Sequence, residues 1–119
     1  MAQDRPTASE LLAAIADFLR EEAMPALDKT EPRLGFQMRV AVNSLAILER
    51  EARLGPAADA GEQARLAKLL GHEGTLENLN RELARQLRAG ARDEGDAALM
   101  AHLDATIADK IAIANPKWK

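Results

Sequence analysis

Apolar residues recur along this chain every three or four positions, which is the spacing of an α-helix that buries one side. No segment alternates apolar and polar residues over a useful length, so the pattern predicts five helices and no β-strand. The first helix is expected to begin after Thr7, whose hydroxyl can form a capping box with Glu10, and to end at Pro25. Its apolar stripe consists of Leu11, Leu12, Ile15, Phe18 and Leu19.

The other four helices are bounded by similar signals. The second contains Phe36 and is expected to run to about Leu54, where Gly55 and Pro56 stop it. A short third helix fits residues 59–70, with Leu66, Leu69 and Leu70 inward and Gly71 as its C-terminal cap. The fourth helix lies between Thr75 and Gly90 and has a seam of Leu76, Leu79, Leu83 and Leu87. The fifth helix lies between Asp96 and the pair Asn115 and Pro116. Its apolar side holds Leu99, Met100, Leu103, Ile107 and Ile111.

A chain of 119 residues is the usual size of one domain, and few aromatic residues with abundant alanine favour closely packed helices. The expected fold is therefore all-α, a single-domain helical bundle over residues 1–119.

The second helix is unusual because its apolar residues form two faces. At 100° per residue, one broad face holds Leu34, Met38, Ala41, Val42, Leu45, Leu48 and Ala52, and a second holds Phe36, Val40 and Ile47. Such a helix is expected to be covered on both sides, either at the centre of the bundle or by a partner subunit in a homo-oligomer.

Four polar residues beside these apolar positions are the candidate binding residues. Arg39, Asn43 and Arg50 lie along one side of the second face, and Asn80 borders the leucine seam of the fourth helix. In one interpretation they form a structural network, since a buried amide without a partner costs ~1–3 kcal/mol. In the other, they bind an anion or a carboxylate of a partner protein, for which an arginine fork is suited.

Charge and composition exclude several classes of function. The net charge of −3 and the pI near 5.4 provide no general attraction to nucleic acid or to anionic membranes. The longest apolar run, LLAAIA, is far shorter than the ~20 residues that span a bilayer, and cysteine is absent. We therefore expect a soluble, cytoplasmic protein.

No catalytic or metal-binding motif is visible, so the sequence predicts a non-enzyme without a cofactor. His102 and Asp109 lie two turns apart on one side of the fifth helix, and His72 lies in a glycine-flanked loop. A zinc site needs three or four ligands at a recognisable spacing, and these residues do not provide one. Both histidines are expected at the surface. Residues 66–87 fit a helix-turn-helix poorly. The stripe of Arg81, Arg85 and Arg88 is expected to be solvated, or alternatively to dock an acidic partner or a phosphorylated ligand.

Four segments carry a resemblance to a family: RPTASELLAAIADFL, FQMRVAVNSLAILERE, LENLNRELARQLRAG and HLDATIADKIAIANPKW. The chain resembles a small bacterial family of unknown function, found beside or fused to aminoglycoside-phosphotransferase-like proteins and often near acyl-CoA dehydrogenases. The resemblance includes Arg39, Val40, Asn43, Arg50, Glu51, Leu79, Asn80, His102, Asn115 and Pro116, and implies no catalytic role for them. It departs from the family at Gln37, where histidine is common, and at Trp118, where tyrosine is frequent and an aromatic ring packing back on the bundle is expected.

Two hypotheses follow. The leading one is a non-catalytic accessory domain that docks on a phosphotransferase-like or acyl-CoA-metabolising partner through the second apolar face of the second helix and its arginines. The alternative is a small-molecule module, in which the second, fourth and fifth helices enclose a pocket for an acyl or phosphorylated ligand held by Arg39 or Arg50.

Overall fold

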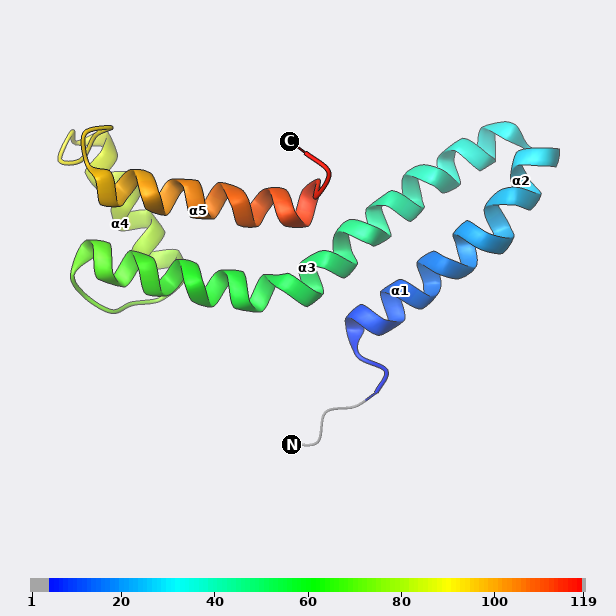
Figure 1. Ribbon diagram of the computed structural model, residues 1–119, viewed down its shortest axis with the longest axis horizontal. Helices are drawn as coiled ribbons and strands as arrows, with labels where there is room; N and C mark the ends of the chain where they lie inside the picture. The colour runs from blue at the N-terminus through cyan, green and yellow to red at the C-terminus, as the bar shows by residue number, and fades with distance from the viewer. Residues whose placement is uncertain (1–4, 119) are drawn as a thin grey trace. The chain divides into compact units, whose positions relative to one another are not determined.

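The computed structural model describes residues 5–118, and all regular structure within this range is helical. The helical elements are α1 (Ala8–Phe18), the π-helical turn η1 (Leu19–Ala23), α2 (Met24–Thr30), α3 (Pro32–Leu70), α4 (Leu76–Arg88) and α5 (Ala97–Ala114) (Figure 1). The all-α prediction is confirmed. Because α1, η1 and α2 follow one another without a break, residues 5–118 form four continuous helical segments rather than the predicted five.

The prediction that Pro25 ends the first helix is wrong. Pro25 lies in the first turn of α2, where its missing N–H leaves no bond of that helix unmade. The π-helical turn before it changes the hydrogen-bond register, and Met24 N–H donates to the carbonyl of Leu19. The chain therefore passes Pro25 and ends its first helical segment at Thr30.

The predicted break at Gly55 and Pro56 is also wrong, because both residues lie inside α3. Pro56 removes one backbone N–H from the helix, but the residue before it has no Cβ to clash with the proline ring. The surrounding alanines favour helix. The predicted second helix and the predicted helix over 59–70 are therefore parts of one element.

The predicted caps at the helix ends are confirmed. Thr7 and Glu10 form the capping box, with distances of 3.2 Å from Glu10 N to Thr7 Oγ1 and 2.9 Å from Thr7 N to Glu10 Oε1. Thr75 accepts from Asn78 N and Asp96 from Leu99 N. Glycines in the left-handed region follow α3 and α4, with φ of 86° at Gly71 and 75° at Gly90.

The chain divides into two compact units, Met1–Leu54 and Gly55–Lys119. In the N-terminal unit, the segment α1–η1–α2 runs antiparallel to the first part of α3 (Figure 1). Ala16, Gly35 and Val42 are its buried residues within the described range, so this hairpin has a small core. The prediction of a single domain stays a prediction.

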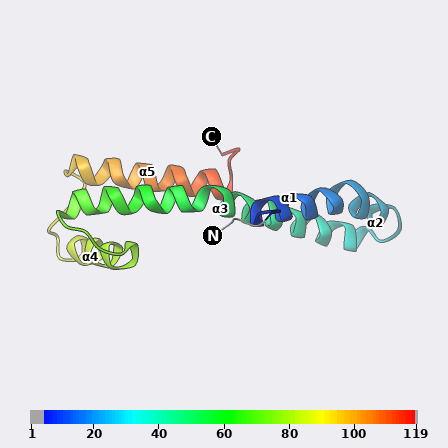
Figure 2. The ribbon, with the colours of Figure 1, turned by 90° about the horizontal axis from the view of Figure 1, so that it is seen from below.

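The C-terminal unit holds the larger core. Figure 2 shows α5 and α4 on two sides of the C-terminal part of α3. One leucine from each helix is almost fully buried: Leu66 of α3, Leu79 of α4 and Leu99 of α5. Leu69, Leu70, Leu76 and Leu103 pack around them together with the buried Ala67 and Leu83.

The buried side of α5 differs from the predicted one. Leu99 and Leu103 face inward as expected, but Met100 and Ile107 are exposed, and His102 takes the inward position instead. Trp118, expected to pack back on the bundle, lines a shallow groove with Ile107 and Ile111 and remains 65% exposed. No helix in the described part of the chain is long and apolar enough to cross a membrane.

Candidate functional site

The predicted site residues are divided between the two units of the chain. Arg39, Asn43 and Arg50 belong to the N-terminal unit, whereas Asn80 belongs to the C-terminal unit. Asn80 is exposed, and its Nδ2 donates to Glu62 Oε2 over 3.1 Å. A network joining Asn80 to the other three is therefore not a feature of either unit.

Arg39 ties the two arms of the N-terminal hairpin together. Its Nη2 lies 3.1 Å from Asp28 Oδ2, so the guanidinium of α3 pairs with a carboxylate near the end of α2. The bond is half-exposed, and pairs of that kind contribute little to stability. Its main effect is to position the Arg39 side chain along one edge of α3.

Gly35 lets the same two helices approach closely. A Cβ at this position would lie 3.2 Å from Asp28 Cα and would overlap the Asp28 carboxylate. Gly35 is buried, and its N–H donates to the carbonyl of Glu31 over 2.9 Å. The tip of the hairpin is therefore built around a residue without a side chain.

The second apolar face of α3 is solvent-exposed. It consists of Phe36, Val40 and Ile47, here called the Phe36 stripe. Phe36 is 62% exposed and Val40 51% exposed. The prediction that neighbours wrap this helix on all sides is wrong within the N-terminal unit, where α3 packs through the side that holds Gly35 and Val42.

Asn43 lies at the edge of the Phe36 stripe. It is exposed, and its side chain has no hydrogen-bond partner within residues 5–118. An exposed amide beside exposed apolar side chains can give direction to a contact that is otherwise apolar. Arg50, near the same edge, is half-buried and engaged in an interaction.

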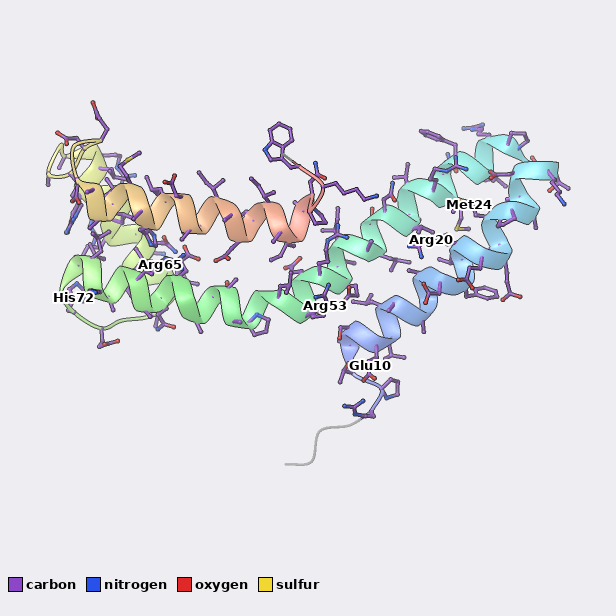
Figure 3. All side chains as sticks on the ribbon, in the orientation of Figure 1. Glu10, Arg20, Met24, Arg53, Arg65 and His72 are labelled. Carbon is purple, nitrogen blue, oxygen red and sulfur yellow. The ribbon has the colours of Figure 1, made fainter. Side chains whose placement is uncertain are left out.

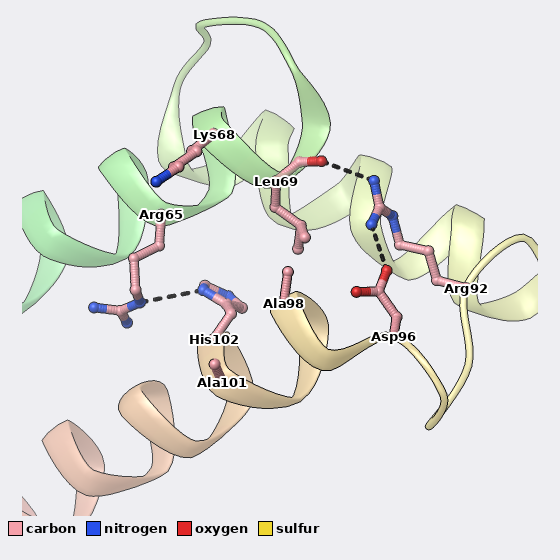
Figure 4. Close-up of a pocket in the computed structure, with 8 residues that line it drawn as sticks. All are labelled: Arg65, Lys68, Leu69, Arg92, Asp96, Ala98, Ala101 and His102. Atoms are coloured by element: carbon pink, nitrogen blue, oxygen red, sulfur yellow. Dashed lines mark hydrogen bonds and ion pairs between the residues drawn. The ribbon is translucent and has the colours of Figure 1, made fainter.

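A cavity of about 480 Å³ lies in the C-terminal unit, between α3 and the start of α5 (Figure 4). Its walls combine apolar side chains with charged ones, which is the usual make-up of a small-molecule pocket. None of the four predicted site residues lines it. The lining residues are Arg65, Lys68, Leu69, Arg92, Asp96, Ala98, Ala101 and His102.

Arg65 of α3 lies at the cavity and contacts three residues along one side of α5. Its Nε donates to Nδ1 of His102 over 3.2 Å, its Nη2 donates to Thr106 Oγ1 over 3.3 Å, and Nη2 also lies 3.9 Å from Asp109 Oδ2. Since the three partners are spaced i, i+4 and i+7, they form one row on α5. A single arginine of α3 thereby contacts two turns of α5.

The Arg65–His102 bond determines the protonation of the imidazole. An arginine Nε can only donate, so Nδ1 of His102 must be the acceptor and the proton is on Nε2. His102 is 4% exposed. Burial lowers the pKa of His102, and the positive charge of Arg65 lowers it further, against a smaller opposite effect of Glu62. The expectation that His102 lies at the surface is wrong.

Arg92 is a clamp at the end of the cavity. Its guanidinium donates to Leu69 O over 2.8 Å, to Asp96 Oδ2 over 2.8 Å and to Gln86 Oε1 over 2.5 Å. It thus satisfies a carbonyl at the C-terminus of α3 and holds the N-cap of α5. The backbone hydrogen bond from Leu99 is the main reason that the pKa of Asp96 is lowered, with Arg92 adding to it.

His72 is the exposed counterpart of His102, as predicted. Its Nε2 lies 2.8 Å from Glu82 Oε1 and its Nδ1 lies 2.9 Å from the carbonyl of Glu73 (Figure 3). These two acceptors, the carbonyl of Glu73 first, raise the pKa of His72. The two histidines of the chain therefore have opposite shifts.

Sequence reasoning missed Arg65, Lys68 and Arg92. One signal was present: His102 and Asp109 fall on one side of α5, and a polar row on a helix that must be buried requires a donor from a neighbour. Arg65 carries no local motif, since its partners lie on α5, and Arg92 pairs with the nearby Asp96 but also donates to the carbonyl of Leu69, 23 residues away. The arginine row of α4 behaves as expected, with Arg81 paired to Glu77 at 2.8 Å on an exposed face.

Residues 25–118 match the family model of a domain of unknown function (DUF6285). The chain belongs to the DUF6285 family. The matched range begins in α2 and includes both the Phe36 stripe and the residues around the cavity. The DUF6285 match thus agrees with the resemblance to a family of unknown function. Comparisons with curated proteins and with solved structures give no match.

Proposed function

We propose that this DUF6285 protein is a non-catalytic interaction domain that docks on a phosphotransferase-like partner through the Phe36 stripe. The observation that carries the proposal is the distribution of apolar surface. Within residues 5–118, twelve large hydrophobic side chains are exposed, and eight of them belong to the N-terminal unit, whose described apolar residues are buried only at Ala16 and Val42. An apolar surface of this kind on a small hairpin is typical of an interface.

The chemistry of the Phe36 stripe suggests what it would bind. Phe36 offers a large aromatic side chain, and Val40 and Ile47 extend the apolar strip along the helix. Asn43 adds an amide NH2 group as donor and a carbonyl oxygen as acceptor at its edge. The matching surface is an amphipathic helix with a narrow apolar stripe and one polar group opposite Asn43.

The choice of partner rests on the resemblance to proteins found beside or fused to phosphotransferase-like proteins. Fusion places two domains at a high local concentration, so that even a weak contact between them is occupied. Fusion therefore favours a phosphotransferase-like protein over an acyl-CoA dehydrogenase as the direct binding partner. The cytoplasm, where such enzymes work, is the proposed location.

Photo-crosslinking tests the proposal directly. A photoreactive phenylalanine at Val40 should crosslink to the phosphotransferase-like protein when both are produced together. The same residue at Lys29, an exposed position of α2 in the same unit, is the control and should crosslink much less. Crosslinks from Val40 only to a second copy of the chain, only to an acyl-CoA dehydrogenase or to no protein would refute the proposal.

A further inference from the structure

We infer that the cavity between α3 and α5 binds a small organic anion, whose charged head is held by Arg65 and Lys68 and whose apolar body lies on Leu69, Ala98 and Ala101. A volume of about 480 Å³ falls within the range of pockets for drug-sized ligands, ~300–1,000 Å³. The inference does not depend on the Phe36 stripe, since every residue involved belongs to the C-terminal unit.

The charge of the cavity wall is positive. Arg92 and Asp96 neutralise each other over 2.8 Å, and the remaining bonds of Arg92 are made to protein oxygens. Arg65 and Lys68 are left as the cations of the wall, and the carboxylate nearest to Arg65 is 3.9 Å away, outside the cavity lining. Two cations beside an apolar wall favour an anion over a neutral ligand.

The donors of Arg65 are divided between the protein and the cavity. Nε and Nη2 are used by the α5 row, whereas Nη1 makes no hydrogen bond within the described residues and lies 3.4 Å from where a Cβ of Gly61 would be. Lys68 lies one turn further along α3, and its ammonium has no ion-pair partner within the described residues (Figure 4). Carboxylates and phosphates have two or more oxygens that can accept hydrogen bonds from cations of this kind.

His102 gives the cavity a neutral donor. Because Nδ1 accepts from Arg65, the Nε2 atom carries the proton, and His102 is one of the lining residues. The bond to His102 also holds the Arg65 guanidinium in one orientation, which lowers the entropic cost of binding a ligand there. The site is therefore organised before the ligand arrives.

The apolar part of the wall determines the body of the ligand. Leu69 from α3 and the methyl groups of Ala98 and Ala101 from α5 line it, and no aromatic residue is among the lining residues. A flat nucleobase would find no ring to stack on. An aliphatic chain attached to a carboxylate or a phosphate matches both halves of the cavity.

The experiment uses four probes on the full chain, followed by amide and methyl chemical shifts. Octanoate and octyl phosphate contain both halves of the expected ligand, octanol lacks the charge, and inorganic phosphate lacks the chain. Octanoate or octyl phosphate should shift Ala98, Ala101 and Lys68 saturably, at least ~tenfold more tightly than octanol or inorganic phosphate. Whichever of the two binds more tightly identifies the head group.

Two matched pairs of variants locate the site. Lys68→Gln should weaken binding several-fold, whereas Lys29→Gln, which removes the same charge from α2, should leave it unchanged. Ala101→Leu should fill the cavity and weaken binding, whereas Ala108→Leu, two turns further along α5 and outside the lining, should not. Shifts confined to the N-terminal unit, no saturable binding of either amphiphile, or equal affinities within both pairs would overturn the inference.

Discussion

The Nε–H of Arg65 on α3 donates a hydrogen bond to Nδ1 of His102 on α5 over 3.2 Å. This single bond joins two helices, fixes the tautomer of a buried imidazole and orients the guanidinium at the edge of the cavity. It therefore links the packing of the C-terminal unit to its proposed ligand site.

The first prediction concerns the two histidines. His102 should carry its proton on Nε2 when neutral and should become doubly protonated only at a lower pH than an ordinary histidine of pKa 6.5, because burial and the charge of Arg65 lower its pKa. His72 should stay protonated to a higher pH, because its pKa is raised by the carbonyl of Glu73 and by Glu82. Nitrogen-15 chemical shifts of both rings across a pH titration test this directly. A titration of His102 above that of His72 would contradict the geometry.

The same shifts predict a dependence of stability on pH. Below pH 6.5 the unfolded chain takes up a proton at His102 that the folded chain resists, so this residue makes folding less favourable as pH falls towards its lowered pKa. His72 acts in the opposite sense, since its contribution is present below 6.5 and is lost as pH rises through its raised pKa. In urea unfolding, His102→Gln should flatten the acid side of the profile, and His72→Gln should not.

Removal of Arg65 should destabilise the C-terminal unit more than removal of a surface arginine. Arg65→Met leaves the buried Nδ1 of His102 without its donor, which costs ~1–3 kcal/mol. Arg81→Met removes an exposed pair with Glu77 and should cost at most about 0.5 kcal/mol. Urea denaturation of the two variants provides the comparison. An equal decrease in the free energy of unfolding for both would show that the Arg65–His102 bond does not stabilise the fold.

Alanine substitutions at two glycines of α3 should change the stability of the protein in opposite directions. At Gly35 a methyl group would meet the backbone of Asp28, so Gly35→Ala should destabilise the hairpin. At Gly61 the nearest atom is the flexible end of Arg65, at 3.4 Å, and alanine should stabilise the helix by ~0.5–1 kcal/mol. Thermal unfolding of both variants is the measurement, and stabilisation at Gly35 would refute the close approach of α2 and α3.

Local signals in the sequence were sufficient for the helix class and most caps. Thr7, Thr75 and Asp96 cap because their side chains reach backbone N–H groups within three residues, and Gly71 and Gly90 adopt positive φ where they were expected to end helices. The helix ends predicted at Pro25 and Pro56 were wrong. A π-helical turn precedes Pro25 and a glycine precedes Pro56, and both allow the helix to continue past the proline.

The candidate site was harder to predict than the fold. The two faces of α3 were visible in the sequence, but whether the second would be covered depends on elements far along the chain or on another protein. The contacts of Arg65 span 37 residues to His102 and 41 to Thr106, so no local window contains both partners. The position of Arg65 at the cavity edge could therefore not be predicted from the spacing of residues in the sequence.

The affinity of the purified chain for its phosphotransferase-like partner tests the central claim most directly. We predict measurable binding for the wild type, a loss of at least tenfold, or about 1.4 kcal/mol, for Phe36→Ser combined with Val40→Ser, and no change for the neighbouring surface variant Gln37→Ser. Binding that the double variant leaves intact, or no binding by the wild type, would contradict a docking role for the Phe36 stripe.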